Sequence, residues 1–359
     1  MNSSKRLFMD VHVIQTLPPS NINRDDTGSP KTAQYGGVKR ARVSSQSWKR
    51  AMRLYFNEFG AANEVGVRTK DIVAYVAEKI REIDSGKESD EAMTLAETVI
   101  NKAGISTKDH KAKALFFMGN QQAKNLAQAA LDGQADKKTL QKIMNDNPNI
   151  DIALFGRMVA DDPSLNEDAS AQVAHAVSTH AVQTEFDYYT AMDDLSPEDQ
   201  AGAGMLGNIE YNSSTLYRYA NVAVHDLNRQ VKGKEETIDA LKLFVKAFCN
   251  SLPTGKINTF ANQTLAQMLV VVLRTDRPVN LVTAFENPVR AKDGYVEASV
   301  DRFAEEFTKS QKFVDEPSAV YCLTTVPNEK LTALGENVDS ISVLLQSLGD
   351  QLNTLMEGI

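Results

Sequence analysis

The most regular pattern of apolar and polar positions lies between residues 36 and 59. Apolar side chains recur there at a period of about 3.6 residues, which predicts an amphipathic helix with one face packed on a core. These side chains are Trp48, Ala51, Met52, Tyr55, Phe56 and Phe59. The other face carries Gln46, Lys49, Arg50, Arg53 and Asn57. We expect a basic strand over residues 36–43 to lead into this helix.

The start of this helix has the features of an anion site. Ser44 and Ser45 lie at the expected N-cap, and the first N–H groups of a helix have no intrahelical partners. The positive end of the helix dipole and nearby cations favour a phosphate there. The preceding run adds three cations with no acid between them, Lys39, Arg40 and Arg42. We therefore predict a polyanionic ligand; a solvated helix face with a serine cap is the alternative.

Other segments alternate between apolar and polar residues or are rich in β-formers, which predicts strands. We expect β structure at residues 7–15, 150–159, 182–194, 214–224, 266–275 and 319–325. The alternation within 182–194 places one set of side chains on a common face: Val182, Thr184, Phe186, Tyr188, Thr190 and Met192. Residues 196–208 are rich in Gly, Ala and turn formers, so the strands on either side are expected to form a long hairpin. Residues 16–43 contain several prolines and glycines and are expected to form a long, functional loop.

Residues 61–148 have the pattern of successive helices. One apolar stripe runs from Ile72 to Ile83, and a second helix is expected between a cap at Ser89 and a stop at Gly104. Further helices are expected at residues 109–131, 136–145, 235–250 and 297–310, and in the leucine-rich run from Ile341 to Leu355. We interpret residues 61–148 as a helical insertion in a mixed α/β domain.

Composition narrows the class of protein. A chain of 359 residues can bury a large core in one domain or two. It has no apolar run of the roughly 18 to 20 residues that a membrane span needs, and no signal-peptide pattern, so we expect a cytoplasmic protein. Cys249 and Cys322 lie far apart in apolar segments and are expected to be buried thiols, not a disulfide or a zinc site. His12 is expected to be structural.

Charge is distributed unevenly along the chain. The formal net charge is −8, from 39 Lys and Arg against 47 Asp and Glu. Residues 1–60 contain ten basic and four acidic residues, a balance of +6, so the remainder carries −14. A basic surface on an acidic body can bind a nucleic-acid backbone locally, while the acidic remainder limits non-specific binding.

Several motifs along the chain resemble those of a known family. They are NRDD at 23–26, GGVKRARVSSQSWKRAMR at 36–53, DIALFGRM at 151–158, AHAVSTH at 174–180, YYTAMDDL at 188–195, YRYANV at 217–222 and KDGY at 292–295. In order and approximate spacing they resemble the Cas-seven-type backbone subunits (CasC) of the type I-E CRISPR surveillance complex Cascade.

The resemblance implies an α+β fold with an RRM-like (ferredoxin-like) palm, a helical fingers insertion and a long β-hairpin thumb. The segments would be 1–60 (palm, first part, with the basic helix), 61–148 (fingers), 149–181 (palm, continued), 182–224 (thumb) and 225–359 (rest of the palm and C-terminal helix). It also implies that copies stack head to tail along CRISPR guide RNA, beside other Cascade subunits and away from any membrane. Each thumb would displace a guide nucleotide, so that target DNA pairs with the guide in short segments.

The resemblance further implies which residues contact RNA. Those expected near the sugar-phosphate backbone are Arg24, Lys31, Arg42, Ser44, Ser45, Gln46, Lys49 and Arg53. Those expected against displaced or neighbouring bases are Met158, Tyr189, Thr190 and Met192, with Met158 on a strand beside the hairpin and the other three on its base-facing side. No catalytic residue, metal or cofactor is implied.

Two other functions stay open at this point. Asp25 and Asp26 are adjacent carboxylates that could hold Mg²⁺ in a ribonuclease, but the sequence places no third ligand or catalytic histidine nearby. A protein-only structural oligomer fits the acidic body and the C-terminal helix but leaves the basic N-terminal cluster unexplained. We therefore favour a non-catalytic RNA-binding scaffold, in which base pairing with the guide supplies sequence specificity.

Overall fold

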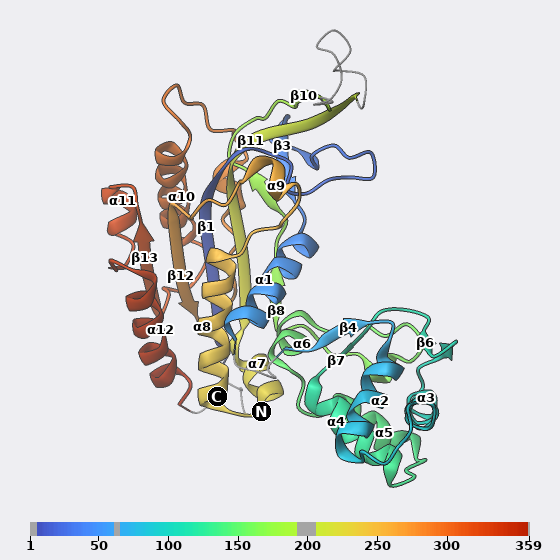
Figure 1. Ribbon diagram of the computed structural model, residues 1–359. Coiled ribbons are helices and arrows are strands. Elements are labelled where there is room, and N and C mark those ends of the chain that lie inside the picture. Colours follow the sequence, from blue (N-terminus) through green and yellow to red (C-terminus); the bar gives the residue numbers. More distant parts are fainter. Residues whose placement is uncertain (1–5, 61–64, 192–205, 358–359) are drawn as a thin grey trace.

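The computed structural model describes residues 6–60, 65–191 and 206–357. A large mixed sheet runs through the molecule with its strands in the order β14-β13-β12-β1-β11-β9-β3-β2, and β8 and β10 also pair with β11 (Figure 1). The strands are β1 (Phe8–Ser20), β2 (Thr32–Tyr35), β3 (Val38–Val43), β8 (Ala171–Val173), β9 (Ala176–Ser178), β10 (Glu185–Thr190), β11 (Leu206–Ala223), β12 (Met268–Arg274), β13 (Ala319–Thr324) and β14 (Glu336–Asn337). The predicted α+β class is confirmed.

Four strands at the centre of the sheet are connected through two helices. Along the chain the elements follow as β1, α1 (Ser45–Phe59), β9, β11, α8 (Lys234–Asn250) and β12. In space these strands lie in the order β12-β1-β11-β9, and each neighbouring pair is antiparallel. Strand β1 is buried along most of its length, because both of its neighbours pair with it and helices cover both faces of the sheet.

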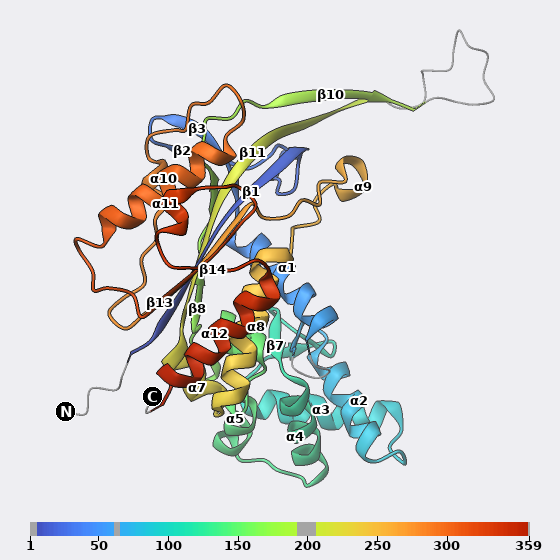
Figure 2. The same ribbon diagram turned by 90° about the vertical axis from the view of Figure 1, so that its left-hand side faces the viewer.

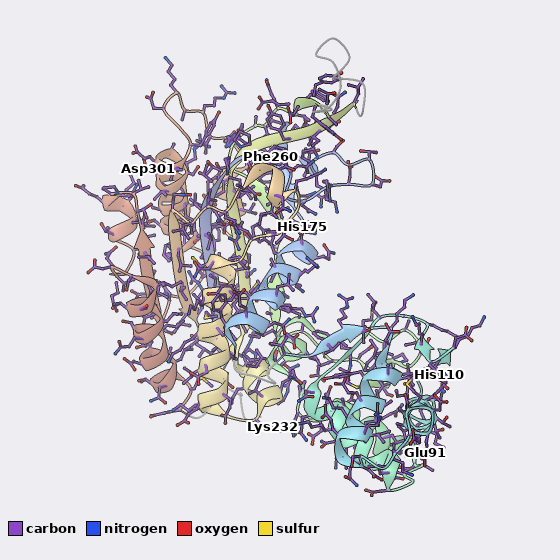
Figure 3. All side chains as sticks on the ribbon, in the orientation of Figure 1. Glu91, His110, His175, Lys232, Phe260 and Asp301 are labelled. Carbon is purple, nitrogen blue, oxygen red and sulfur yellow. The ribbon has the colours of Figure 1, made fainter. Side chains whose placement is uncertain are left out.

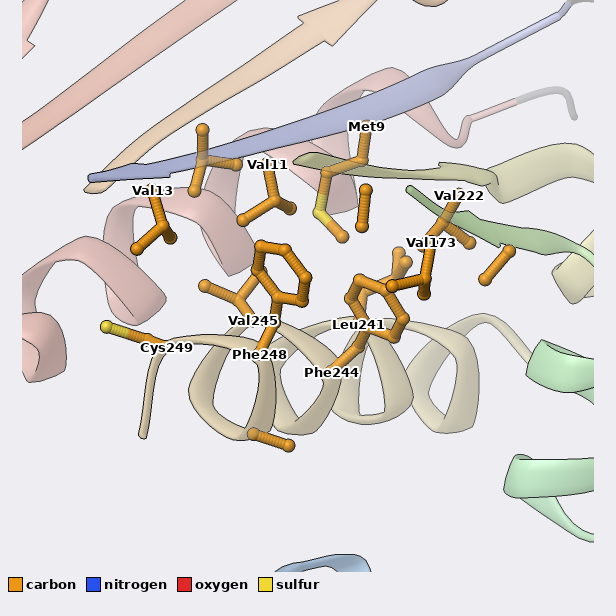
Figure 4. Packing of buried hydrophobic residues seen from close by; sticks show 14 of the residues in the cluster. Met9, Val11, Val13, Val173, Val222, Leu241, Phe244, Val245, Phe248 and Cys249 are labelled. Carbon is orange, nitrogen blue, oxygen red and sulfur yellow. The ribbon is translucent and has the colours of Figure 1, made fainter. Parts of the chain in front are cut away.

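The two faces of the sheet have separate apolar cores. On one face α1, α8 and α12 (Ile341–Leu355) share an apolar core with the sheet, and Figure 4 shows Phe244 and Phe248 of α8 against Val11 and its neighbours. On the other face α10 (Val296–Ser310) packs through Phe303 (Figure 2). The remaining elements are α7 (Val224–Val231), α9 (Ile257–Phe260), α11 (Glu329–Thr332) and the 3₁₀ turns η1 (Pro163–Leu165) and η3 (Val282–Phe285).

A second, mainly helical unit lies beside one end of the sheet (Figure 1). It comprises α2 (Ile72–Ile83), α3 (Ser89–Ala103), α4 (Asn120–Leu131), α5 (Lys137–Asn145) and the short strands β4 (Val67–Thr69), β5 (Thr107–Lys108), β6 (Lys111–Ala112) and β7 (Phe116–Met118). Its helices bury a core of their own that includes Ile80, Ile100 and Leu126. Helix α6 (Ile150–Phe155) connects this unit back to the sheet. The five segment boundaries expected from the sequence stay predictions.

Most of the predicted elements are confirmed. The five strands β1, β10, β11, β12 and β13 and the helices α2, α5, α8, α10 and α12 form where periodicity placed them. Gly104 ends α3 with φ +107°, a left-handed conformation that glycine adopts readily. Ser89 is the first residue of α3, one position after the cap.

Residues 16–43 are not a loop throughout, so that expectation was wrong. The basic strand expected over residues 36–43 is confirmed as β3. Strand β1 continues to Ser20 and passes two prolines where its pairing with β11 is irregular, between Leu17 and Ser20. Strands β2 and β3 form a hairpin around Gly36 and Gly37, whose φ angles of +59° and +76° suit a two-residue turn. Two adjacent glycines between strand-forming residues are compatible with a loop or with a tight hairpin turn, and the structure shows the hairpin turn.

Two other predicted elements were wrong. Residues 150–159 were expected to be a strand, but α6 begins after Asn149 and ends at Gly156, whose φ is +76°. A short apolar run does not distinguish a strand from a buried helix by periodicity. The helix expected at 109–131 begins only at Asn120, because residues 107–118 form β5, β6 and β7 and Gly119 is the N-cap.

The side chains expected to be structural are buried. Cys249 and Cys322 are free and buried, which confirms the prediction, and burial raises the pKa of Cys322 to about 12. His12 is buried with Nδ1 2.9 Å from the hydroxyl of Tyr217, and burial lowers its pKa to about 3. Within the described ranges, every helix is too short or too polar to cross a membrane.

Candidate nucleic-acid interface

The N-terminal end of α1 is attached to a loop that carries basic side chains. Ser44 is the N-cap, and its side chain accepts a hydrogen bond from Ser47 N at 3.4 Å. The backbone N–H of Ser44 donates to Asn23 Oδ1 at 2.8 Å, which ties residues 21–31 to the helix. Ser45 follows as the first helical residue and is half-buried. The predicted cap is thus confirmed at Ser44.

The apolar face of α1 points into the core, as the sequence predicted. Trp48, Met52 and Phe56 are buried beneath the sheet. Phe59 was expected on the same face but is 54% exposed at the end of the helix, so that part of the expectation was wrong; its ring centre lies 4.3 Å from that of Tyr55. With the apolar residues turned inward, the polar face of α1 is left for solvent or a ligand.

A hollow of about 570 Å³ adjoins this polar face. Its wall combines α1 with the segment that follows α6 and with residues of the helical unit. The lining residues are Gln46, Lys49, Arg50, Arg53, Arg68, Leu115, Phe117, Phe155, Gly156, Arg157 and Met158. Five of these described residues are cationic and none is a carboxylate, so the hollow suits an anion. It brings together four of the predicted RNA-binding residues.

Lys49 and Arg53 contribute to this hollow in different ways. Lys49 Nζ lies 5.5 Å from the centre of the Phe155 ring, and burial lowers the pKa of its ammonium group. Arg53 Nε pairs with Asp151 Oδ2 at 3.1 Å, and its Nη2 donates to the carbonyl of Gly66 at 3.2 Å. Burial raises the pKa of Asp151, although Arg53 opposes that effect. Arg53 therefore holds α1 to α6 and to the start of the helical unit, in addition to lining the hollow.

Met158 lies at the rim of the same hollow and is 85% exposed. It follows α6 and belongs to no strand, so its expected place on a strand beside the hairpin was wrong. Helix α6 lies at one end of the sheet and β10 at the other (Figure 1). Arg157, by contrast, is buried and donates to the carbonyl oxygens of Leu165, Phe117 and Met144, which makes it structural.

Arg42 and Lys31 form a second basic group near the start of α1. Arg42 Nε donates to the carbonyl of Thr32 at 3.1 Å, and its Nη1 lies 3.1 Å from His175 Nδ1. Burial, helped by the charges of Arg42 and Lys31, lowers the pKa of His175, so that its ring can accept this hydrogen bond. Figure 3 shows His175 close to the end of α1 that follows β3. Arg24 lies nearby on the loop of residues 21–31 and is exposed.

Arg40 belongs to the core, so its interpretation as part of a solvent-facing cationic run was wrong. Its side chain is fully buried. Nη1 donates to the carbonyl of Ser178 at 2.8 Å, Nη2 to that of Phe285 at 2.7 Å and Nε to that of Tyr35 at 3.1 Å. Backbone carbonyls thus satisfy the guanidinium without any carboxylate, and the sequence has no signal for such an arrangement.

The hairpin of β10 and β11 extends past the sheet, as Figures 1 and 2 show. Every residue of β10 is exposed, and the large side chains of Phe186 and Tyr188 are 66% and 65% exposed. They share one face with Leu206, which is opposite Thr190 in the register and 63% exposed. Large apolar groups in this position are available to a ligand or a neighbouring molecule.

Tyr189 is on the other face of this hairpin. It is opposite Gly207, where an added Cβ would come within 2.5 Å of the tyrosine ring, so the ring covers this glycine and is 38% exposed. Because consecutive strand residues point to opposite faces, Tyr189 and Thr190 cannot both be on one base-facing side, and that part of the expectation was wrong. Met192 lies outside the described residues.

Asp25 and Asp26 lie on the exposed loop of residues 21–31. Asp25 Oδ1 accepts hydrogen bonds from Thr27 Oγ1 at 2.7 Å, from Thr27 N at 3.0 Å and from Ser29 N at 3.0 Å. These bonds, that of the Thr27 side chain first, lower the pKa of Asp25. Over the described ranges, no group of three or more His, Cys, Asp or Glu residues has the geometry to hold a metal ion.

Nearly the whole chain matches one family of known proteins. The sequence model of the CT1975-like protein family matches residues 9–348. The chain belongs to the CT1975-like protein family. Comparison of this CT1975-like protein with curated proteins gave no match.

Two solved structures are similar to this CT1975-like protein. One is a chain of a "CRISPR RNA-guided surveillance complex, pre-nicking", with 31% identity and a TM-score of 0.85, covering 96% of this chain and 100% of that chain. The other is a chain of a "CRISPR RNA-guided surveillance complex", with 29% identity and a TM-score of 0.76, covering 96% of this chain and 99% of that one.

The structure of this CT1975-like protein also shows residues that sequence reasoning did not select. Arg50 belongs to the polar face of α1 and could have been chosen from the helical pattern alone. Arg68 and Leu115 reach the hollow from the helical unit, which no local motif indicated. Phe186 and Tyr188 were placed on a strand correctly, but their exposure depends on the hairpin leaving the sheet.

Proposed function

We propose that this CT1975-like protein is a backbone subunit of a CRISPR RNA-guided surveillance complex of type I-E, Cascade, in which it binds guide RNA and presents it to target DNA. The observation that carries the proposal is the hollow beside α1, whose described lining contains several cationic side chains and no carboxylate. Identity of 31% over 96% of the chain to part of a surveillance complex supports RNA as the polyanion.

The arrangement of the sheet supports an RRM-like (ferredoxin-like) palm. The chain order β1, α1, β9, β11, α8, β12 is a β-α-β-β-α-β sequence, and the spatial order β12-β1-β11-β9 places the last strand beside the first. In this interpretation the helical unit of α2 to α5 is the fingers insertion, and the hairpin of β10 and β11 is the thumb.

The chemistry of the hollow supports binding to the sugar-phosphate backbone. Lys49, Arg50 and Arg68 offer ammonium and guanidinium donors, which bind phosphates of any sequence. Specificity would then come from pairing between the guide and DNA. In one chain, α6 and the hairpin lie at opposite ends of the sheet, so Met158 and the hairpin side chains would meet at one guide segment only if copies stack head to tail.

A non-catalytic role is part of the proposal. Asp25 uses one carboxylate oxygen for three hydrogen bonds within its own turn, and these favour a rigid loop over a free metal ligand. The purified protein should therefore leave RNA intact in Mg²⁺ or Mn²⁺. Cleavage that disappears in a variant with Asp25→Asn and Asp26→Asn would favour a ribonuclease instead.

Fluorescence anisotropy with labelled poly(U) RNA at increasing salt tests the binding proposal. Replacing Lys49 and Arg42 by Gln removes two charges, so the slope of log K against log salt should fall by about 0.7 for each phosphate that the protein no longer neutralises. Lys312→Gln, an exposed lysine that follows α10 on the other side of the sheet, is the control and should leave the slope unchanged. An unchanged slope in the folded double variant, or no binding by the natural protein, would refute the proposal.

A further inference from the structure

A second hollow, of about 280 Å³, lies on another side of α1. Its wall is made by the first turns of the helix, by the loop of residues 21–31 and by residues 252–256, which follow α8. Three cationic side chains line it: Arg24, Arg50 and Lys256. None of the described residues in its lining is a carboxylate. Residues 252–256 carry no pattern that indicated a role in the sequence.

The loop that supplies Lys256 is held tightly against the rest of the site. A Cβ added to Gly255 would lie 2.3 Å from the carbonyl oxygen of Ile22, so the two backbones are in direct contact. Lys256 itself has φ +51°, a left-handed conformation that is unfavourable for a residue with a side chain. Strain of this kind persists where the surrounding structure imposes it, and it is common at functional sites.

The loop that supplies Arg24 is fixed as well. Arg24 forms a backbone bridge with Pro30, and Asn21 Nδ2 donates to the carbonyls of Gly28 at 3.0 Å and Glu210 at 2.8 Å. Three separate segments therefore present a cation each to one small space from ordered backbone. Because the site is already ordered, the protein loses less conformational entropy when a ligand binds.

Arg50 joins the two hollows, because it lines both of them. Lys49 is next to it on the side of the larger hollow, and Lys256 is across from it in the smaller one. The cationic surface therefore continues across the start of α1 from one hollow to the other. A polyanion with regularly spaced charges, such as single-stranded RNA, fits a continuous surface of this kind better than one isolated anion does.

We propose that the second hollow is a phosphate site for the same RNA, in which Arg50 and Lys256 bind the backbone together with Arg24. This inference rests on the proposed function. It adds Lys256 to the RNA-binding residues and gives Arg50 a second hollow in which to bind phosphate. The strand would pass from Lys49 over Arg50 to Lys256, so that one chain neutralises phosphates on both sides of the helix.

Salt-dependent binding of labelled poly(U) RNA to the full chain tests this site. Arg50→Gln and Lys256→Gln should each reduce the slope of log K against log salt by about 0.7, and the double variant by about twice that. Lys256→Arg keeps the charge and should keep the slope. Lys312→Gln again serves as the exposed control. Circular dichroism and the urea midpoint establish that each variant is folded.

The outcomes separate this site from the proposed function. A reduced slope for Lys256→Gln, restored in Lys256→Arg, supports the second hollow. Arg50 lines both hollows, so Lys256→Gln decides between them. If Lys49→Gln reduces the slope while folded Lys256→Gln does not, the second hollow is not a phosphate site and RNA binding stands. If Lys49→Gln, Arg50→Gln and Lys256→Gln all leave the slope unchanged, both proposals fail.

Discussion

Replacing Arg53 by Ala should destabilise the protein strongly, although Arg53 lies at a surface hollow. Its Nε lies 3.1 Å from Oδ2 of Asp151, a carboxylate with no exposed side-chain surface. Oδ1 of the same residue accepts from Gly66 N at 2.9 Å. Among the described residues, Arg53 is the only cation in an ion pair with Asp151. The substitution would therefore leave the buried carboxylate without a partner of opposite charge.

The magnitude follows from the burial of the two partners. Removing one partner of a buried ion pair typically costs about 3 to 5 kcal/mol, because the other charge stays buried and uncompensated. The Arg53 side chain keeps 20% of its surface exposed, so water can partly replace it and the lower end, about 3 kcal/mol, is expected. Asp151→Asn in the same chain removes the unpaired charge, so the double variant should recover a large part of the loss.

The loss should also depend on pH. Burial raises the folded-state pKa of Asp151, so above about pH 4 the folded chain binds more protons at this site than the unfolded chain does. Stability therefore falls as pH rises through that window. Without Arg53 the folded pKa rises further, which extends the window upward. Arg53→Ala should therefore cost less at acid pH, where more of Asp151 is protonated, than near neutral pH.

Urea unfolding at pH 4.5 and pH 7.5 measures these effects, with the m-value as a check on two-state behaviour. Lys49→Ala is the matched control, since Lys49 lines the same hollow and forms no ion pair with any described residue. The reasoning fails if Arg53→Ala costs no more than Lys49→Ala, or if Asp151→Asn does not recover stability. It also fails if the cost is equal at the two pH values.

Two further predictions concern a turn and the hairpin. Gly36→Ala should lower the urea midpoint more than Gly37→Ala does. Both residues have positive φ, but only at Gly36 would an added Cβ clash, because it would lie 1.6 Å from the carbonyl oxygen of Glu286. The opposite order of the two midpoints would contradict the structure. Tyr189→Ala combined with Met158→Ala should change which guide nucleotides react with a chemical probe in the assembled complex and leave the salt slope unaltered, since neither residue is charged. Uniform reactivity of the guide in the complex with the natural protein would show that the hairpin does not displace guide nucleotides.

The sequence predicted the elements whose signal is local. The apolar stripes of α1, α2, α8 and α12 and the alternation of β10 and β11 depend on one periodicity each, and all of these elements form. It did not separate the short helix α6 from a strand, because six residues hold less than two turns of pattern. It also missed β2 and its pairing with the predicted basic strand β3, because the turn between them consists of two glycines that equally suit a loop.

The hollows depend on contacts between distant segments, which a single sequence does not contain. The larger one combines α1 with Arg68, Leu115 and the segment after α6, and the smaller one adds residues 252–256. The family resemblance identified residues of α1 that line both hollows, because one of its motifs covers most of that helix. The residues contributed by the helical unit and by the loop after α8 became visible only in three dimensions.

The basic residues that suggested a polyanion differ in what already satisfies them, and this decides which ones report on RNA. Arg40 gives its guanidinium donors to backbone carbonyls in the core, and Arg53 gives two of its donors to Asp151 and Gly66. Substituting either residue would disturb the fold, so weaker RNA binding in such a variant would not identify a contact. Lys49, Arg50 and Lys256 line the hollows without those attachments. None of these three charges forms an ion pair with a described residue, so a change in the salt slope on substituting them reports on the interaction with phosphate.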